Sequence, residues 1–219
     1  FCHALPGQWY RMAITLSAAS CLAWLAELTG APNQAALLAE AGQVDRDIGS
    51  LIFLPYLSGK HMPNDDPAAR GVFFGLTHAT SRADLTRAVL EGVAFAFADG
   101  LATLREAGSD PADLAVIGGG ARSPFWARIL ASVLNRPLTF PKGGELGGAC
   151  GAARLARWAM TGEAPGTLCL PPPAEFTAQP HPVLVERYAE RLHAFRSLYH
   201  SLEIGMTDRA PSRTLQMAK

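Results

Sequence analysis

The chain has 219 residues, of which 49% are hydrophobic and 17% are charged. A chain of this length and composition can bury a full core, which excludes the class of intrinsically disordered proteins. The formal net charge is zero, so no broad basic surface is predicted, and this argues against nucleic acid as the main partner.

The four cysteines form no CxxC pair and no cluster with zinc-ligand spacing, so we expect buried, reduced thiols. The longest uncharged run near the start, residues 12–26, is too short to span a bilayer. No segment has the basic leader and small-residue cleavage site of a signal peptide. We therefore expect a cytoplasmic protein with no membrane partner.

The first elements in chain order are a hairpin and a helix. Residues 1–5 and 9–14 are short apolar runs joined by Pro6-Gly7, which predicts a β-hairpin. Residues 17–28 carry apolar side chains at three- and four-residue spacing before Gly30, which predicts a helix.

The middle of the chain is predicted to hold an insertion and then a long helix. We expect a short helix within residues 32–49, an ordered loop over residues 51–66 and a strand over residues 71–76. Ser81–Asp84 reads as a capping box, and an apolar stripe follows it to Gly108, which predicts a long helix.

The remaining elements alternate between strands and helices. We predict strands over 114–117 and 138–140, helices over 124–134, 149–160 and 183–202, and a proline-rich, non-helical connector over 162–182. Such alternation predicts an α/β domain. A Rossmann half would not begin with an antiparallel hairpin, whereas an RNase H-like domain would.

These elements divide the chain into three parts. We expect an RNase H-like lobe over residues 1–161, with an insertion over 31–70. A proline-rich connector and a C-terminal helix over 162–204 would pack on this lobe, and 205–219 would form a disordered tail.

The run LAVIGGGARSPFW, residues 114–126, is the most informative stretch. A predicted strand enters three glycines, and Ser123 and Pro124 suit the N-cap and first position of a helix. This arrangement lets bare backbone N–H groups approach a phosphate or ribose. The segment is neither a GxGxxG fingerprint nor a Walker A loop, and a tight turn without a ligand explains it as well.

Two segments match the second signature of the FGGY carbohydrate kinases. They are GVFFGL at residues 71–76 and, after a gap of seven residues, DLTRAVLEG at residues 84–92. FLPYLSG at 53–59 and IGGGARSPFW at 117–126 are most similar to the members that phosphorylate D-xylulose. The resemblance covers about residues 1–204 and is restricted to the C-terminal lobe of these two-lobed proteins.

The resemblance implies an α/β, RNase H-like (actin-like ATPase) fold with a mixed sheet flanked by helices. The N-terminal strand of that sheet and the partner lobe would lie outside this sequence. It also implies transfer of the γ-phosphoryl group of ATP, with Mg²⁺, to D-xylulose, giving D-xylulose 5-phosphate. The sugar would bind through the missing N-terminal lobe, and the catalytic aspartate would precede Phe1, so the isolated chain would be inactive.

By the same resemblance, Gly118, Gly119, Gly120 and Ala121 would line the nucleotide site. Ser123 would either donate to the nucleotide or only cap its helix.

The start of the first predicted helix is a second part of this implied site. Ser17 and Ala19 would face the ribose or phosphates, or would only allow close packing between the helix and the sheet. Glu91 and Asp99 lie eight residues apart on one helix, too far for a catalytic dyad, and we expect solvated or loop-bracing carboxylates.

One departure and two alternative functions stay open. Lys60-His61 stands where the family usually carries Glu-Arg, which reverses one charge. In the first alternative the kinase acts on ribulose, gluconate or glycerol. In the second alternative the chain is a non-catalytic, actin-like nucleotide-binding module. If the sheet lacks its first strand, the edge of the hairpin is unpaired, and the isolated chain would be poorly soluble or would form a homodimer through that edge.

Overall fold

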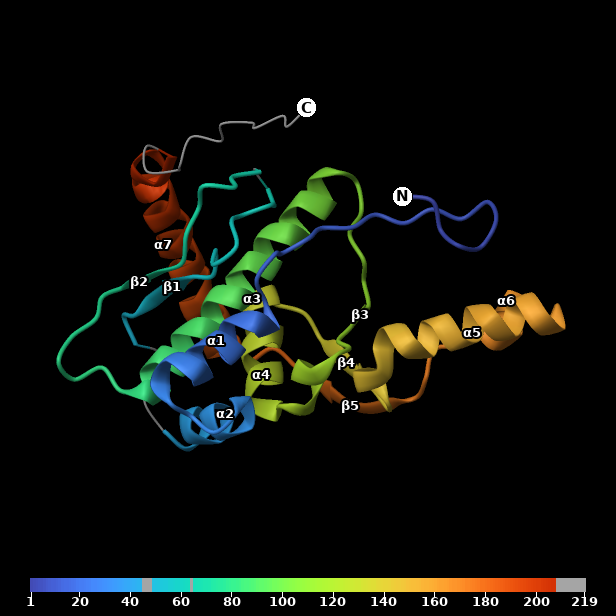
Figure 1. Ribbon diagram of the computed structural model, residues 1–219, viewed down its shortest axis with the longest axis horizontal. Coiled ribbons are helices and arrows are strands. Elements are labelled where there is room, and N and C mark those ends of the chain that lie inside the picture. The colour runs from blue at the N-terminus through green and yellow to red at the C-terminus, as the bar shows by residue number, and fades with distance from the viewer. Residues whose placement is uncertain (45–48, 64, 208–219) are drawn as a thin grey trace, which may run out of the picture.

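Helix α3 (Arg82–Glu106) runs through the centre of the computed structural model, and the other elements pack around it (Figure 1). The structure describes residues 1–44, 49–63 and 65–207. Side chains on every face of the middle of α3 are buried, from Ala88 to Ala96. A helix that is apolar all round belongs in a core, and α3 is enclosed by α1 (Ala19–Thr29), α2 (Gln34–Gln43), α4 (Pro124–Leu134) and α7 (Pro182–Thr207).

Two small sheets flank this helical core. β1 (Ile52–Leu54) pairs antiparallel with β2 (Val72–Phe74), with Phe53 opposite Phe73. The second sheet has the order β3 (Leu114–Ala115), β4 (Leu138–Pro141), β5 (Ala174–Ala178), in which β3 and β4 are parallel and β4 and β5 antiparallel. The expected mixed sheet flanked by helices is therefore confirmed.

Local signals in the sequence fix several helix ends. Ser81 and Asp84 form the predicted capping box of α3, with the Asp84 N–H donating to Ser81 Oγ at 3.2 Å. Ser123 caps α4, whose first residue is Pro124, and Gly30 ends α1 in the left-handed conformation.

A close backbone contact sets the distance between α3 and β1. A Cβ atom on Gly92 would lie 2.2 Å from the carbonyl oxygen of Phe53, so only glycine allows the helix and the strand to approach this far.

Two predictions from the first half of the chain need correction. Residues 51–66 contain strand β1, because Ile52–Leu54 are buried against α3 and paired with β2. The N-terminal hairpin has one isolated bridge, between Cys2 and Trp9, and no regular strand. The second helix lies within the expected range 32–49, of which residues 45–48 lie outside the described residues.

The proline-rich connector is more regular than expected. Residues 162–182 contain the short helix α6 (Pro165–Leu168) and strand β5. The strand packs on β4, where the Phe176 ring stacks on Phe140 at 4.3 Å between centroids. Helix α7 continues to Thr207, and the rest of the expected tail lies outside the described residues.

The periphery differs from the core. Helix α5 (Gly147–Thr161) follows the 3₁₀ turn η2 (Gly144–Leu146), has no buried residue and extends away from the other helices together with α6 (Figure 1). The N-terminal segment also runs outward and exposes Phe1 and Trp9. The core itself is formed by α1–α4, α7, β1 and β4.

Candidate functional site

The glycine-rich turn after β3 has an open backbone. Gly118 has φ of 98°, a left-handed conformation that favours glycine, and its N–H donates to the Gly144 carbonyl at 2.9 Å. The 3₁₀ turn η1 (Gly119–Arg122) follows. Because Gly119 and Gly120 are its first residues, no turn of η1 provides an acceptor for their N–H groups.

This turn borders an apolar cavity of about 330 Å³. Its volume is at the lower end of the range for small-molecule sites, roughly 300–1,000 Å³. The walls come from α1, α2, α3, α4 and the glycine turn. The lining residues are Ala18, Ala19, Leu22, Gln34, Leu38, Val89, Leu90, Val93, Phe97, Val116, Ile117, Gly118, Gly119, Gly120, Ala121, Trp126 and Leu130.

Five of the seven predicted site residues meet at this cavity: Ala19, Gly118, Gly119, Gly120 and Ala121. Ser17 does not line it; this residue is buried beside Tyr56 and Lys60 at a smaller cavity. Ser123 does not line it either, and its Oγ accepts a hydrogen bond from the Trp126 N–H at 3.2 Å. The observed contact of Ser123 is thus the helix cap.

The glycines leave space that a side chain would fill. A Cβ atom at Gly118 or Gly119 would meet no atom within 4 Å, whereas one at Gly120 would lie 3.4 Å from the Trp126 Nε1. The cavity therefore combines flat apolar walls with exposed backbone N–H groups. These features suit a planar base with polar groups attached to it.

Arg122 lies on the rim beside the second glycine turn. Its guanidinium is 3.9 Å from the Glu145 carboxylate, and most of the Arg122 side chain is exposed. Gly144 and Gly147 lie close to the start of the first turn. A Cβ atom added to Gly144 would contact Val116, and one added to Gly147 would contact Ile117. The second turn therefore supports the first.

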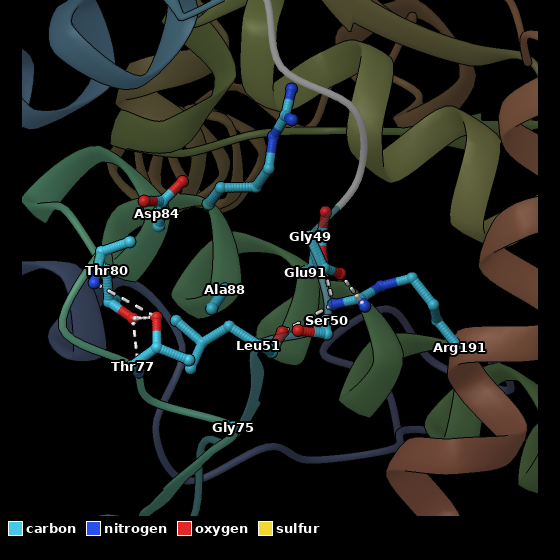
Figure 2. A pocket seen from close by; sticks show the side chains of 12 residues that line it. Gly49, Ser50, Leu51, Gly75, Thr77, Thr80, Asp84, Ala88, Glu91 and Arg191 are labelled. Atoms are coloured by element: carbon cyan, nitrogen blue, oxygen red, sulfur yellow. Dashed lines mark hydrogen bonds and ion pairs between the residues drawn. The ribbon is translucent and has the colours of Figure 1, made fainter.

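A second cavity, of about 160 Å³, lies between α3, α7 and the loop before β1, and its lining is polar (Figure 2). Arg191 reaches into it from α7 and donates to the Glu91 carboxylate at 2.6 Å. Its guanidinium also donates to the carbonyl oxygens of Gly49 and Leu51. Tyr188 donates to the other Glu91 oxygen at 3.3 Å.

Of the two expectations for Glu91, solvated or loop-bracing, the solvated one is wrong. Its side chain is 2% exposed, and burial raises the pKa of this carboxyl, while the Arg191 guanidinium opposes the rise. Asp99 is also buried and pairs with Arg196 at 2.7 Å. Both ion pairs join α3 to α7, and the Arg191 Nε–H at this cavity is buried without a partner among the described residues.

The loop with Lys60 and His61 lies away from the apolar cavity. Lys60 is 5% exposed, and its Nζ lies 3.5 Å from the centroid of the Tyr199 ring. His61 contacts the Asp65 carboxylate at 3.1 Å. Lys60 therefore packs this loop on α7.

Three further findings limit the chemistry of the described residues. Within them, no group of three or more His, Cys, Asp or Glu side chains could hold a metal ion. Across the described ranges, no helix is both long and apolar enough to cross a bilayer. The four cysteines are free thiols, but only Cys21 is buried, which corrects the expectation for Cys2, Cys150 and Cys169.

Sequence reasoning missed two polar groups of the apolar cavity, Gln34 and the indole of Trp126. Gln34 begins α2, and Trp126 lies in the first turn of α4. Gln34 belongs to no motif and Trp126 ends the motif of residues 117–126, and only the packing of α2 and α4 around α3 brings the two residues together.

Residues 2–160 match the family described as "FGGY family of carbohydrate kinases, C-terminal domain". The chain is 46% identical over 203 residues to the xylulose kinase of Escherichia coli strain K12. That match covers 92% of the chain and 42% of the relative. A crystal structure of a xyloylose kinase from Brucella ovis superposes with a TM-score of 0.85 at 44% identity, covering 93% of this chain and 43% of that one.

A xylulose kinase structure from Lactobacillus acidophilus superposes with a TM-score of 0.74 at 26% identity, covering 87% of this chain and 39% of that one. The chain spans about two fifths of the length of these relatives. The likeness confirms the expected α/β, actin-like fold. The chain belongs to the FGGY family of carbohydrate kinases and carries the C-terminal domain of that family.

Proposed function

We propose that this chain is the nucleotide-binding half of a kinase that transfers the γ-phosphoryl group of ATP to D-xylulose. The observation that carries the proposal is the bare glycine turn at an apolar cavity. The 46% identity to a protein named xylulose kinase supports this sugar over ribulose, gluconate or glycerol. We also propose the cytoplasm, where ATP is made and used, as its compartment.

The residues present fit a nucleotide. Leu22, Val93 and Phe97 offer apolar surface to a base. The N–H groups of Gly119 and Gly120 belong to a turn in which no side chain covers these two residues. Bound there, ATP would supply the phosphoryl group, and the glycine turn would hold its ribose or phosphates. The second glycine turn, through the Gly118–Gly144 hydrogen bond, would keep this loop in place.

The remaining groups of the reaction are proposed to lie outside this chain. Phosphoryl transfer needs a positioned carboxylate to accept the hydroxyl proton of the sugar. No carboxylate lines the apolar cavity, and Glu91 is paired with Arg191 on the other side of α3. We therefore place the catalytic aspartate and the sugar site upstream of Phe1, and Mg²⁺ on the ATP phosphates.

Substitution of Gly119 tests the proposed nucleotide site. A Gly119→Val side chain would project into open space at the turn and block the nucleotide, so we expect ATP-analogue affinity of the complete gene product to fall about a hundredfold. Isothermal titration calorimetry measures this change. Gly205→Val on α7 is the matched control, because a Cβ there also meets nothing within 4 Å.

Activity assays separate the half-kinase from the alternatives. We expect xylulose phosphorylation by the complete gene product and none by the 219-residue chain. Turnover by the chain alone would contradict the placement of the essential carboxylate. Nucleotide binding without phosphorylation of any sugar by the complete gene product would favour a non-catalytic module.

The free edge of the second sheet motivates a further expectation. β3 pairs with β4 on one side, and no described strand pairs with its other side. Unpaired strand edges attract other chains, so we propose that the isolated chain self-associates through β3. Light scattering that shows a monomer at micromolar concentration would contradict this.

A further inference from the structure

Gln34 is an isolated hydrogen-bonding side chain on the wall of the apolar cavity. Every other lining residue is apolar or glycine, except that Trp126 also carries an indole N–H. Gln34 is the first residue of α2, and Leu38, one turn later, lines the same wall. In an apolar site, the few polar groups set the orientation and identity of the ligand.

Gln34 is an exposed residue, and its carboxamide is available for a ligand. Among the residues described, none accepts from or donates to this side chain. The start of α2 is instead capped by Asn33, whose Oδ1 accepts from the Ala36 N–H at 2.9 Å. The helix therefore does not need Gln34 as a cap, and both the N–H₂ and the C=O of its side chain can meet a bound molecule.

We propose that Gln34 reads the purine base of the bound nucleotide and selects adenine over guanine. The proposal rests on the proposed function of the cavity as a nucleotide site. A carboxamide presents a donor and an acceptor side by side. Adenine presents the complementary pair, its 6-amino group beside N7 or N1, which is why glutamine recognises adenine through two hydrogen bonds.

Guanine fits the same wall less well. On its N7 edge it offers two acceptors, N7 and O6, so one of the two carboxamide groups stays unpaired. On its N1 edge a rotated carboxamide is satisfied, but the 2-amino group is then buried among apolar side chains without an acceptor. An unpaired buried polar group lowers affinity roughly ten- to hundredfold.

The test uses the complete gene product and three nucleoside diphosphates: ADP, GDP and IDP, whose base lacks the 2-amino group. We expect ADP to bind more tightly than GDP by about ten- to hundredfold, with IDP between them. Gln34→Leu should lower ADP affinity about tenfold and GDP affinity by less, because guanine gains its hydrogen bonds to the carboxamide only at the cost of an unpaired 2-amino group. Isothermal titration calorimetry gives all three dissociation constants.

Gln34→Glu is the more discriminating variant, because it replaces the hydrogen-bond donor of the carboxamide with a second acceptor. A carboxylate accepts from both N1–H and the 2-amino group of guanine and repels the ring lone pairs of adenine. We expect the ADP:GDP affinity ratio to fall at least tenfold. Its repulsion of the phosphates is common to all three ligands and cancels in the ratio.

Gln43→Glu is the matched control, since it makes the same change at the exposed end of α2, outside the cavity lining. This variant should keep the wild-type ratio. Tight ADP binding with the same ADP:GDP ratio in wild type, Gln34→Leu and Gln34→Glu would overturn the role of Gln34 alone. A wild-type protein that binds none of the three ligands would overturn both this role and the nucleotide site.

Discussion

The two cavities beside α3 have opposite chemistry, although one helix provides a wall of each. Val89, Val93 and Phe97 face the apolar cavity, whereas Arg87 and Glu91 face the polar one. At 100° per residue these sets lie on opposite sides of the helix. In the polar cavity Arg191 connects Glu91 to two backbone carbonyls through its terminal N–H groups, and its buried Nε–H is left without a partner among the described residues.

The apolar cavity has the reverse property. It contains few polar groups, and those without a partner among the described residues are the Gly119 and Gly120 N–H groups, the Trp126 indole N–H and the Gln34 carboxamide. The comparison shows that the number of charged residues in a cavity is a poor guide to function. Unused hydrogen-bonding groups at a site with space for a ligand are the better guide.

The strongest test of this contrast removes the guanidinium from the polar cavity. Arg191→Leu leaves Glu91 buried without its partner, so we expect the free energy of unfolding of the chain to fall by about 3–5 kcal/mol. Urea unfolding followed by circular dichroism measures the loss.

The matched control replaces both partners. Arg191→Leu combined with Glu91→Leu removes the uncompensated charge, so most of the lost stability should return. Nucleotide affinity of the folded complete gene product should stay at the wild-type value in both variants. A loss of affinity in the double variant, with stability restored, would mean that the polar cavity also serves the ligand.

A second test concerns the contact that holds α3 between the two cavities. The Cβ of a Gly92→Ala variant would lie 2.2 Å from the Phe53 carbonyl oxygen, and α3 and β1 would have to separate. We expect a loss of about 1–3 kcal/mol in unfolding free energy, the usual cost of overpacking a core.

Gly205→Ala on α7 is the comparison for this substitution. A Cβ there meets nothing within 4 Å, and alanine favours helix over glycine by about 1 kcal/mol. The two glycine-to-alanine changes should therefore shift stability in opposite directions. Equal shifts would show that the close approach at Gly92 relaxes without cost.

The sequence predicted the features that depend on local signals. Ser81 with Asp84, and Ser123 with Pro124, begin α3 and α4 as expected, because caps and N1 prolines act on their immediate neighbours. The family signature also has a physical explanation. Its Asp84 caps α3 and its Glu91 pairs with Arg191, so both positions maintain the fold rather than contact a nucleotide.

Features that depend on distant partners were missed. β5 lies next to three prolines, and it is a strand because β4 pairs with it and Phe140 stacks on Phe176. The burial of Glu91 depends on Arg191, one hundred residues later in the chain. Gln34 reaches the cavity because α2 packs on α3. No signal within a short window of sequence contains these contacts.

The smallest effect we predict concerns Lys60, a buried charge near α7. Burial lowers the pKa of the Lys60 ammonium, an effect to which Arg196 adds and which the carboxylates of Asp99, Glu203 and Asp66 oppose. Between this lowered pKa and 10.5 the unfolded chain binds more protons than the folded chain. Stability therefore rises with pH across that interval.

A Lys60→Met variant keeps a similar volume and has no titrating group at this position. We expect the stability of the wild type relative to this variant to increase, on the order of 1 kcal/mol, between pH 7 and pH 10 in urea unfolding. Lys142→Met, at an exposed position, controls for the change in net charge. The stability difference between the wild type and Lys60→Met could instead stay constant or narrow as the pH rises. That result would mean that contact with the Tyr199 ring, 3.5 Å from Nζ, outweighs the cost of burying the charge.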